Sequence, residues 1–339
     1  MTYVNISLNR NENPLVPNFL STLAHLPINR YPDSTASGVR SALADHHGLI
    51  PAQFFVGPGS DAILMHIGQT FLKPGDAAVV PTPSYSGFAD SASTRFAKVV
   101  FWQLTEEFEY DVDRLDSCLK ERPRLVFLCH PNNPTGSVVS LYQLDKIAEL
   151  TSATGALLVV DEAYAEFAED PSYVSALSLV KRDLDVLVLR TFSKFYGLAG
   201  LRIGYAAGPT HLVAALEETA RPFRVNTVAQ QAAVLALQDR AFHTRTLSEI
   251  NQSRQELSRQ LREAGFAIRA GPTNFLLVRV GHGARCAAAL ASMGIDVLPL
   301  RQPGMDEYIR ISLGSVEDVS HVVSALVHVT ASLGADVHD

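Results

Sequence analysis

Short apolar runs alternate with amphipathic stretches between residues 60 and 220. The runs are rich in Val and Leu without polar alternation, which is typical of parallel strands covered on both faces. Between them, apolar positions recur about every 3.6 residues, as on one face of a helix. The pattern therefore predicts a doubly wound α/β domain with right-handed crossovers. The expected strands span 77–82, 124–130, 156–164, 185–193 and 203–208, and the expected helices span 60–72, 140–155 and 211–220.

The pattern changes after residue 226. A long polar amphipathic stretch, 228–264, predicts a helix, and the segments that follow alternate like strands. This change indicates a second, smaller α+β unit. We expect an N-terminal segment (1–25) packed with the small unit, a large domain (26–235) and a small domain (236–335). The strands expected in the small unit are 266–271, 273–280, 296–300 and 308–314, with a helix over 283–294.

Composition narrows the class of protein. Of the 339 residues, 47% are hydrophobic and 19% are charged, as in ordinary soluble proteins. The net charge of −7 and the lack of a basic patch argue against a nucleic-acid partner. No apolar run reaches the roughly 18 residues of a membrane span, and the N-terminus has no apolar signal-peptide region. We expect a cytoplasmic, soluble protein without a membrane partner.

Cysteine and histidine spacing suggests no metal site. The three cysteines, Cys118, Cys129 and Cys286, are scattered and odd in number, and the eleven histidines show no ligand spacing. Neither a disulfide framework nor a metal centre is therefore expected, which fits a reducing compartment.

Polar residues follow four of the expected strands. In an open α/β sheet, sites form at the carboxyl ends of the strands. PTPSY follows one strand, HPNNPTG the next, DEAY another, and TFSK a fourth. We therefore expect one crevice that contains Tyr85, Asn133, Asp161, Tyr164 and Lys194.

These residue types share a chemistry. A lysine in an apolar wall has a lowered pKa and can form a Schiff base with an aldehyde. A buried aspartate is costly alone but is satisfied beside a protonated pyridine nitrogen. A helix N-terminus at GPGSDA can bind a phosphate through free N–H groups, and Arg202 can add a bidentate contact. Together these parts match pyridoxal 5′-phosphate (PLP).

The chain resembles fold-type-I PLP-dependent aminotransferases, and among them the histidinol-phosphate aminotransferase family. The resemblance runs nearly end to end and is carried by ten segments in family-like order and spacing. They are NENP (11–14), RYPD (30–33), GSD (59–61), PTPSY (81–85), PNNPTG (131–136), DEAYAEF (161–167), RTFSKFYGLAGLRIGY (190–205), RPFRVNT (221–227), NFLLVR (274–279) and YIRIS (308–312).

The resemblance implies a role for each matching residue. Lys194 would form the Schiff base and act as general acid–base, and Asp161 would pair with the pyridine nitrogen. Tyr164 and Asn133 would contact the ring oxygen, and Tyr85 would stack on the ring. Arg310 would bind the substrate carboxylate, with Asn133 and Tyr85 also near the substrate. The phosphate would be bound by Ser60, Asp61, Thr191, Ser193, Arg202 and, from the neighbouring subunit of a homodimer, Tyr31.

One position departs from the family pattern. The family has an arginine for the substrate phosphate where this chain has Leu298. Arg224 or Arg301 would then have to bind that phosphate. Without such a substitute, the leucine would suit an apolar or aromatic side chain.

Three reactions therefore remain open. The first is transamination of histidinol phosphate with 2-oxoglutarate. The second is transamination of aromatic or other amino acids in a specialised pathway. The third is decarboxylation, as in the similar threonine-phosphate decarboxylases, or cyclisation. A binding module without catalysis is disfavoured because Lys194 and Asp161 are both present.

Overall fold

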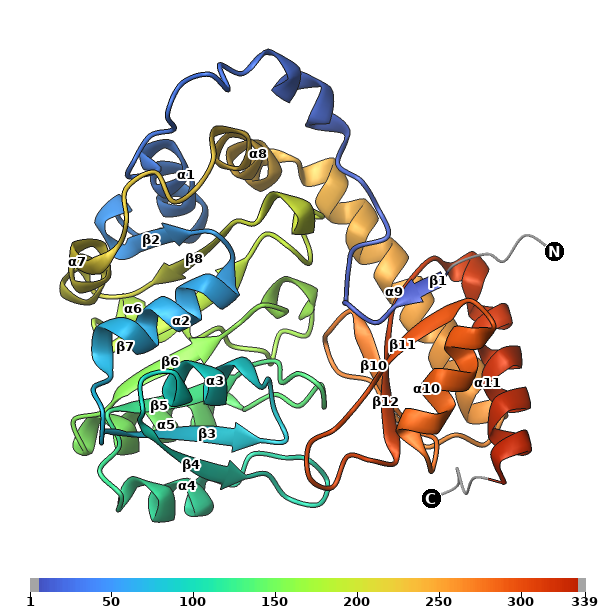
Figure 1. The fold of residues 1–339 in the computed structure, drawn as a ribbon. Coiled ribbons are helices and arrows are strands. Elements are labelled where there is room, and N and C mark those ends of the chain that lie inside the picture. Colours follow the sequence, from blue (N-terminus) through green and yellow to red (C-terminus); the bar gives the residue numbers. More distant parts are fainter. Residues whose placement is uncertain (1–5, 335–339) are drawn as a thin grey trace.

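A computed structural model describes residues 6–334 and contains two sheets (Figure 1). The larger sheet has seven strands in the order β2-β8-β7-β6-β5-β3-β4. Five adjacent strands, from β4 to β7, run parallel, and four of them (β3, β5, β6 and β7) were predicted from the apolar runs. The strands are β2 (Phe54–Gly57), β3 (Ala77–Thr82), β4 (Lys98–Gln103), β5 (Leu125–Cys129), β6 (Leu157–Asp161), β7 (Val186–Thr191) and β8 (Gly204–Ala207).

The direction of β8 corrects the expectation that all five apolar runs are parallel strands. β8 is antiparallel to both of its neighbours, β7 and β2. A parallel connection needs a crossover, usually a helix. Here residues 192–203 contain only a short 3-10 turn, so the chain returns directly and this connection forms the loop that carries Lys194. The edge strands β2 and β4 were not predicted: β2 has four residues, and β4 is largely exposed.

Helices cover both faces of the large sheet. Alternate residues of one strand enter different cores: Leu125 and Phe127 pack with α2, α3 and α7, whereas Val126 and Leu128 pack with α1, α4, α5 and α8. This separation is the period-two alternation of a strand buried on both sides. The helices are α1 (Ser37–His47), α2 (Ser60–Phe71), α3 (Gly87–Ser93), α4 (Val112–Leu119), α5 (Leu141–Ala153), α6 (Leu177–Lys181), α7 (Thr210–Thr219) and α8 (Thr227–Gln238).

The helix expected over 228–264 is two helices. α8 ends at Gln238, and α9 runs from Arg240 to Glu263. Asp239 leaves the helical conformation, and its carboxylate accepts a hydrogen bond from the Phe242 N–H at 2.9 Å, which caps α9. α9 then leads from the large sheet to the small one (Figure 1). No helix within residues 6–334 is long and apolar enough to cross a membrane.

The smaller sheet has five strands in the order β1-β11-β12-β10-β9. β1 pairs in parallel with β11, so the start of the described chain lies against the C-terminal third. The strand expected over 266–271 is only two residues long. The domain boundaries after residues 25 and 235 stay a prediction, the second inside α8. The elements are β1 (Ile6–Leu8), β9 (Ile268–Arg269), β10 (Phe275–Arg279), α10 (Gly283–Ser292), β11 (Ile295–Pro299), β12 (Tyr308–Ser312) and α11 (Val319–Leu333).

Candidate active site

A cavity of about 440 Å³ lies at the carboxyl ends of the parallel strands. Cys129, Asp161 and Thr191, the last residues of β5, β6 and β7, all line it. Arg310 of β12 closes it from the small sheet. Most of the residues predicted from the sequence are therefore brought together. Those that line the cavity are Ser60, Asp61, Tyr85, Asn133, Asp161, Tyr164, Thr191, Ser193, Lys194, Arg202 and Arg310.

Lys194 follows β7 and lies in the cavity wall. Its Nζ donates a hydrogen bond to the carbonyl oxygen of Arg10 at 2.7 Å. Burial lowers the pKa of Lys194 to about 8, and the positive charge of Arg310 acts in the same direction. About a tenth of this amine is therefore unprotonated at about pH 7, far more than for a lysine of ordinary pKa, and the neutral form is the nucleophile.

Asp161 ends β6 and is only 7% exposed. One carboxyl oxygen accepts a hydrogen bond from the Ala163 N–H at 2.9 Å. Burial nevertheless raises the pKa of Asp161 to about 7. A carboxyl group held this way gains most from a cationic hydrogen-bond donor placed in the cavity.

The N-terminus of α2 forms an anion cradle. Its N-cap is Gly59, with φ +97°, and no side chain of the described residues caps its first-turn N–H groups. A Cβ on Gly59 would lie 2.8 Å from the Arg202 guanidinium, and one on Gly204 would lie 2.8 Å from the Ser60 nitrogen. Arg202 also donates to the Ser193 hydroxyl at 3.3 Å. The first-turn N–H groups of α2, the Ser193 hydroxyl and the Arg202 guanidinium thus lie close together. Only glycine fits at positions 59 and 204 beside them.

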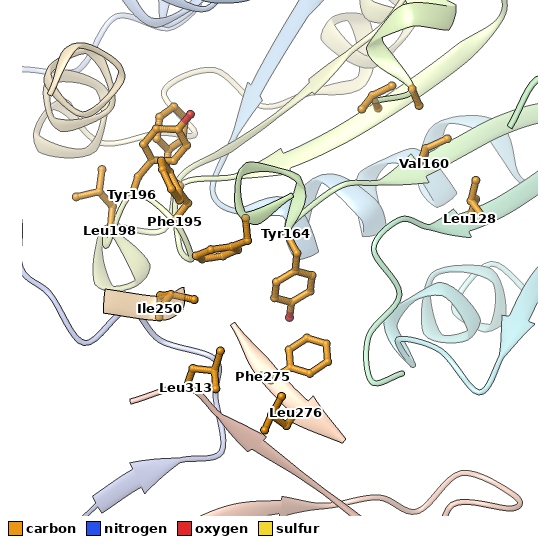
Figure 2. Close-up of a cluster of buried hydrophobic side chains, with 14 of the residues drawn as sticks. Leu128, Val160, Tyr164, Phe195, Tyr196, Leu198, Ile250, Phe275, Leu276 and Leu313 are labelled. Carbon is orange, nitrogen blue, oxygen red and sulfur yellow. The ribbon is translucent and has the colours of Figure 1, made fainter. Parts of the chain in front are cut away.

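Two tyrosines enter the cavity from different elements. Tyr164 packs edge-on against Phe275 of β10, with 5.2 Å between ring centroids, where the two sheets meet (Figure 2). Its hydroxyl accepts a hydrogen bond from the Asn11 side-chain amide at 2.9 Å, and burial raises its pKa to about 12. The Tyr85 hydroxyl donates to Asp61 at 2.9 Å. Tyr164 therefore keeps its own proton available for donation into the cavity.

Arg310 carries the only nearly buried guanidinium among the described cavity-lining residues. It donates to the Asn133 side-chain oxygen at 2.7 Å and to the Asn9 carbonyl oxygen at 2.8 Å. Its Nε is buried and has no hydrogen-bond partner within the described chain. Arg310 is thus a nearly buried cation held by two neutral acceptors, and a carboxylate in the cavity would give it a charge-assisted partner.

The family model for aminotransferase class I and II matches residues 4–326, and therefore nearly the whole chain. The chain belongs to this family. It is 36% identical over 326 residues to histidinol-phosphate aminotransferase 1 of Mesorhizobium japonicum, covering 94% of this chain and 89% of that protein. It is 34% identical over 315 residues to the aromatic amino acid aminotransferase of Streptomyces avermitilis, covering 92% and 86%. The prediction of an aminotransferase of the histidinol-phosphate type is confirmed.

A solved structure of this aminotransferase family confirms the predicted fold. Histidinol-phosphate aminotransferase from Sinorhizobium meliloti, in complex with pyridoxal 5′-phosphate, is 28% identical to this chain. The TM-score is 0.89, and the alignment covers 97% of this chain and 92% of that one. PLP requires donors for its phosphate, an acceptor for its pyridine N–H and an amine for its aldehyde. The anion cradle supplies the donors, the buried Asp161 supplies the acceptor, and the low-pKa Lys194 supplies the amine. The residues of this aminotransferase therefore fit PLP.

Four predicted site residues lie outside the cavity lining of the single chain. Tyr31 is 83% exposed and stacks on Phe223, with 4.8 Å between centroids. Arg224 is engaged elsewhere: it donates to Val56 O at 2.7 Å and to Glu217 at 2.6 Å. Arg301 is exposed on the loop after β11. Within one chain, neither arginine lines the cavity.

Leu298, the fourth of these residues, has a specific neighbour. It pairs with Arg310 across β11 and β12, and Leu277 pairs with Arg310 from the other side. Paired residues of adjacent strands point to the same sheet face. Leu298 also packs on the buried cluster of Leu277, Leu300 and Met305. Arg310 is therefore flanked by two apolar side chains, and one of them, Leu298, stands where the family has a phosphate-binding arginine.

Sequence reasoning assigned no role to Asn11 or Cys129. Asn11 has φ +53°, a conformation that asparagine tolerates, and it bonds Tyr164, Ser312 and Asn274 across the two sheets. The NENP motif was a signal for it. Cys129 is buried in the core, and it also ends β5 directly beside Asp161 in the ladder and lines the cavity. The strand-end rule would have found it.

Proposed function

We propose that this aminotransferase uses PLP to move an amino group between an amino acid, or an amino-alcohol phosphate, and 2-oxoglutarate. One observation carries the proposal: Lys194, with a pKa of about 8, and Asp161, with a pKa of about 7, line the same cavity as an anion cradle. When bound, the cofactor supplies an aldehyde that links to amines and a pyridine ring that withdraws electrons from the attached carbon.

The cradle would hold the cofactor phosphate. The first-turn N–H groups of Ser60 and Asp61 are directed out of α2, and Ser193 and Arg202 lie beside them. Thr191 accepts a hydrogen bond from the Ser193 N–H at 3.1 Å, which fixes the turn that presents this serine. These residues would hold the phosphate end of the cofactor in the cavity that Lys194 also lines.

Lys194 would form the covalent link and then move a proton. Its neutral amine would be the group that links to the cofactor aldehyde. Once freed by the substrate amine, the same amine would be the base that holds and moves the proton of the substrate Cα. Asp161 would hold the proton on the pyridine nitrogen, and this contact would relieve the cost of its burial. Tyr164 and Asn133 would donate to the ring oxygen, and Tyr85 would pack on the ring.

Arg310 would bind the carboxylate of the amino acid and of 2-oxoglutarate. A carboxylate replaces the Asn9 carbonyl oxygen as a stronger, charge-assisted acceptor. Asn133 keeps the guanidinium in place through its 2.7 Å bond. The substrate Cα is then held between Arg310 and Lys194.

The experiment that tests this function traps the lysine link. The protein incubated with PLP is reduced with borohydride, digested and analysed by mass spectrometry. We expect one cofactor per chain, on Lys194, and none on the Lys194→Ala variant. Cofactor bound elsewhere, or a Lys194→Ala variant that transaminates at the wild-type rate, would refute the assignment.

A second candidate function is transamination of aromatic or other apolar amino acids. Leu298 favours it, because an apolar residue flanks Arg310 and neither Arg224 nor Arg301 lines the cavity. Histidinol phosphate, phenylalanine, tyrosine, glutamate and phosphothreonine are each mixed with the PLP-loaded protein. A true donor converts the visible absorbance band of the lysine-linked cofactor into a near-ultraviolet band. Conversion by phenylalanine but not histidinol phosphate selects the second function, and the reverse selects the first.

The proposed cytoplasmic enzyme would be a homodimer with shared sites. Tyr31 and Phe223 are exposed yet stacked on each other, which supports a partner surface over them. In that dimer Tyr31 would reach the cofactor phosphate of the neighbouring subunit. Light scattering should give a mass twice the 36.8 kDa of one chain, and Phe223→Glu should shift it toward the monomer.

A further inference from the structure

A cluster of buried charges joins β7 to the segment after β6. Arg190 is 7% exposed and Glu162 is fully buried. The Arg190 Nε and one of its terminal nitrogens donate to the same Glu162 oxygen, at 3.0 and 2.7 Å. Its other terminal nitrogen donates to Glu166 at 2.9 Å. One guanidinium therefore holds two carboxylates that follow β6.

Glu162 is fixed at both carboxyl oxygens. One oxygen accepts from the Ala176 N–H at 2.6 Å, and the other accepts from the Ser175 hydroxyl at 2.7 Å as well as from Arg190. Ser175 in turn accepts from Arg190 at 2.9 Å. The segment that contains Ser175 and Ala176 therefore holds Glu162 and Arg190 through hydrogen bonds. These charged side chains have little freedom to move.

The cluster begins where the backbone ladder ends. The last backbone bond recorded between β6 and β7 runs from the Glu162 N–H to the Leu189 carbonyl at 2.9 Å. Asp161 immediately precedes Glu162, and Thr191 immediately follows Arg190. Asp161 and Thr191 line the cavity, whereas Glu162 and Arg190 do not. Neighbouring residues of a strand point to opposite faces, so the charges lie on the side away from the cavity.

We propose that Glu162, Glu166 and Arg190 form a clamp of positioning residues that fixes the Asp161–Tyr164 segment relative to the Thr191–Lys194 segment. The two segments carry the acid and the amine that the proposed function needs, so this inference rests on that function. Beyond the last ladder bond, the clamp is a charged side-chain link between them. Small displacements of such groups are costly, because about 1 Å of misplacement can lower a rate about 10²-fold.

Stability alone does not account for the cluster. A buried ion pair is often no more stabilising than apolar residues of the same volume. The clamp carries one cation for two carboxylates, and one oxygen of Glu166 is buried with no partner within the described chain. Burial, only partly offset by Arg190, raises the pKa of Glu166. Burying these charges lowers the stability of the folded chain. In return, the hydrogen bonds of Arg190 fix the distance between β7 and the segment after β6.

The test separates positioning from stability by removing the charges while keeping the shape. The charge-free variant combines Glu162→Gln, Glu166→Gln and Arg190→Met, and the new amide at position 162 can still accept the Ala176 N–H bond. Arg190→Lys keeps the charge but cannot reach three acceptors together. Leu326→Ala, in the fully buried part of α11 far from these strands, is the control that only lowers the melting temperature. Melting temperature and the dissociation constant of PLP are measured for each, the latter by fluorescence titration.

We expect the charge-free and Arg190→Lys variants to bind PLP about 10- to 100-fold more weakly at a temperature where both are folded. They should also shift the absorbance maximum of the lysine-linked cofactor, and Leu326→Ala should change neither. Wild-type affinity and spectrum in the charge-free variant would overturn the clamp. If that variant does not fold, wild-type affinity in Arg190→Lys would overturn it equally. Failure of the wild-type protein to bind PLP would instead refute the proposed function.

Discussion

Replacing Asp161 by Asn should stabilise the cofactor-free chain while it disables the loaded enzyme. Asp161 is buried, and its pKa is raised from 3.8 to about 7. The folded chain therefore binds this proton more tightly than the unfolded chain does. Stability is lost as the pH rises from about 4 to about 7, and the whole penalty is present above about pH 7.

The magnitude follows from these two values. At about 1.4 kcal/mol per pKa unit, the difference between 3.8 and about 7 corresponds to about 4 kcal/mol at pH 8. At about pH 5 the carboxyl of the folded chain is still protonated, and the penalty falls below about 2 kcal/mol. An asparagine has no charge to bury and avoids the penalty at every pH. For a chain of 339 residues, about 4 kcal/mol raises the melting temperature by about 5 °C.

Thermal unfolding of the cofactor-free proteins at about pH 8 and about pH 5 measures this difference. Asp161→Asn should melt higher than wild type at pH 8, by a margin that shrinks at pH 5, whereas exposed Asp116→Asn should match wild type at both. With PLP bound the order should reverse, because only the aspartate holds the pyridine proton. Turnover of Asp161→Asn should fall by several orders of magnitude. An equal or lower melting temperature of the free variant at pH 8, or a margin independent of pH, would refute the reasoning.

Three other changes probe separate parts of the site. Arg202→Gln removes the guanidinium from the anion cradle and should weaken PLP binding by about 1.5–3 kcal/mol, measured by fluorescence titration; unchanged affinity would place the phosphate elsewhere. Leu298→Arg adds a cation beside Arg310 and should raise kcat/KM for histidinol phosphate relative to phenylalanine by about tenfold or more. The same ratio as wild type would show that the side chain of residue 298 does not face the substrate. The rate of PLP attachment should rise about tenfold per pH unit up to about pH 8 and then level off, because the amine of Lys194 must lose its proton. A flat stopped-flow profile between about pH 6 and about pH 9 would contradict the lowered pKa.

The local pattern of the sequence determined much of the fold and the candidate site. Apolar runs located the strands from β5 to β7 to within three residues at each end, because a strand buried on both faces has no polar alternation. Polar residues directly after those runs had to meet at one edge of a parallel sheet, which located Asp161 and Lys194. Each of these conclusions depends only on a residue and its neighbours in the sequence. It can therefore be predicted without the structure.

Tertiary structure decided what depends on a distant partner. Arg224 looked like a substitute for the missing cation, but Val56 and Glu217, brought close by folding, occupy its guanidinium. Glu162 and Arg190 are separated by 28 residues, and only the pairing of β6 with β7 makes them an ion pair. Hydrophobic periodicity reports whether a side chain is buried but not which side chain it meets, and long-range pairing is therefore fixed only when the sheets assemble.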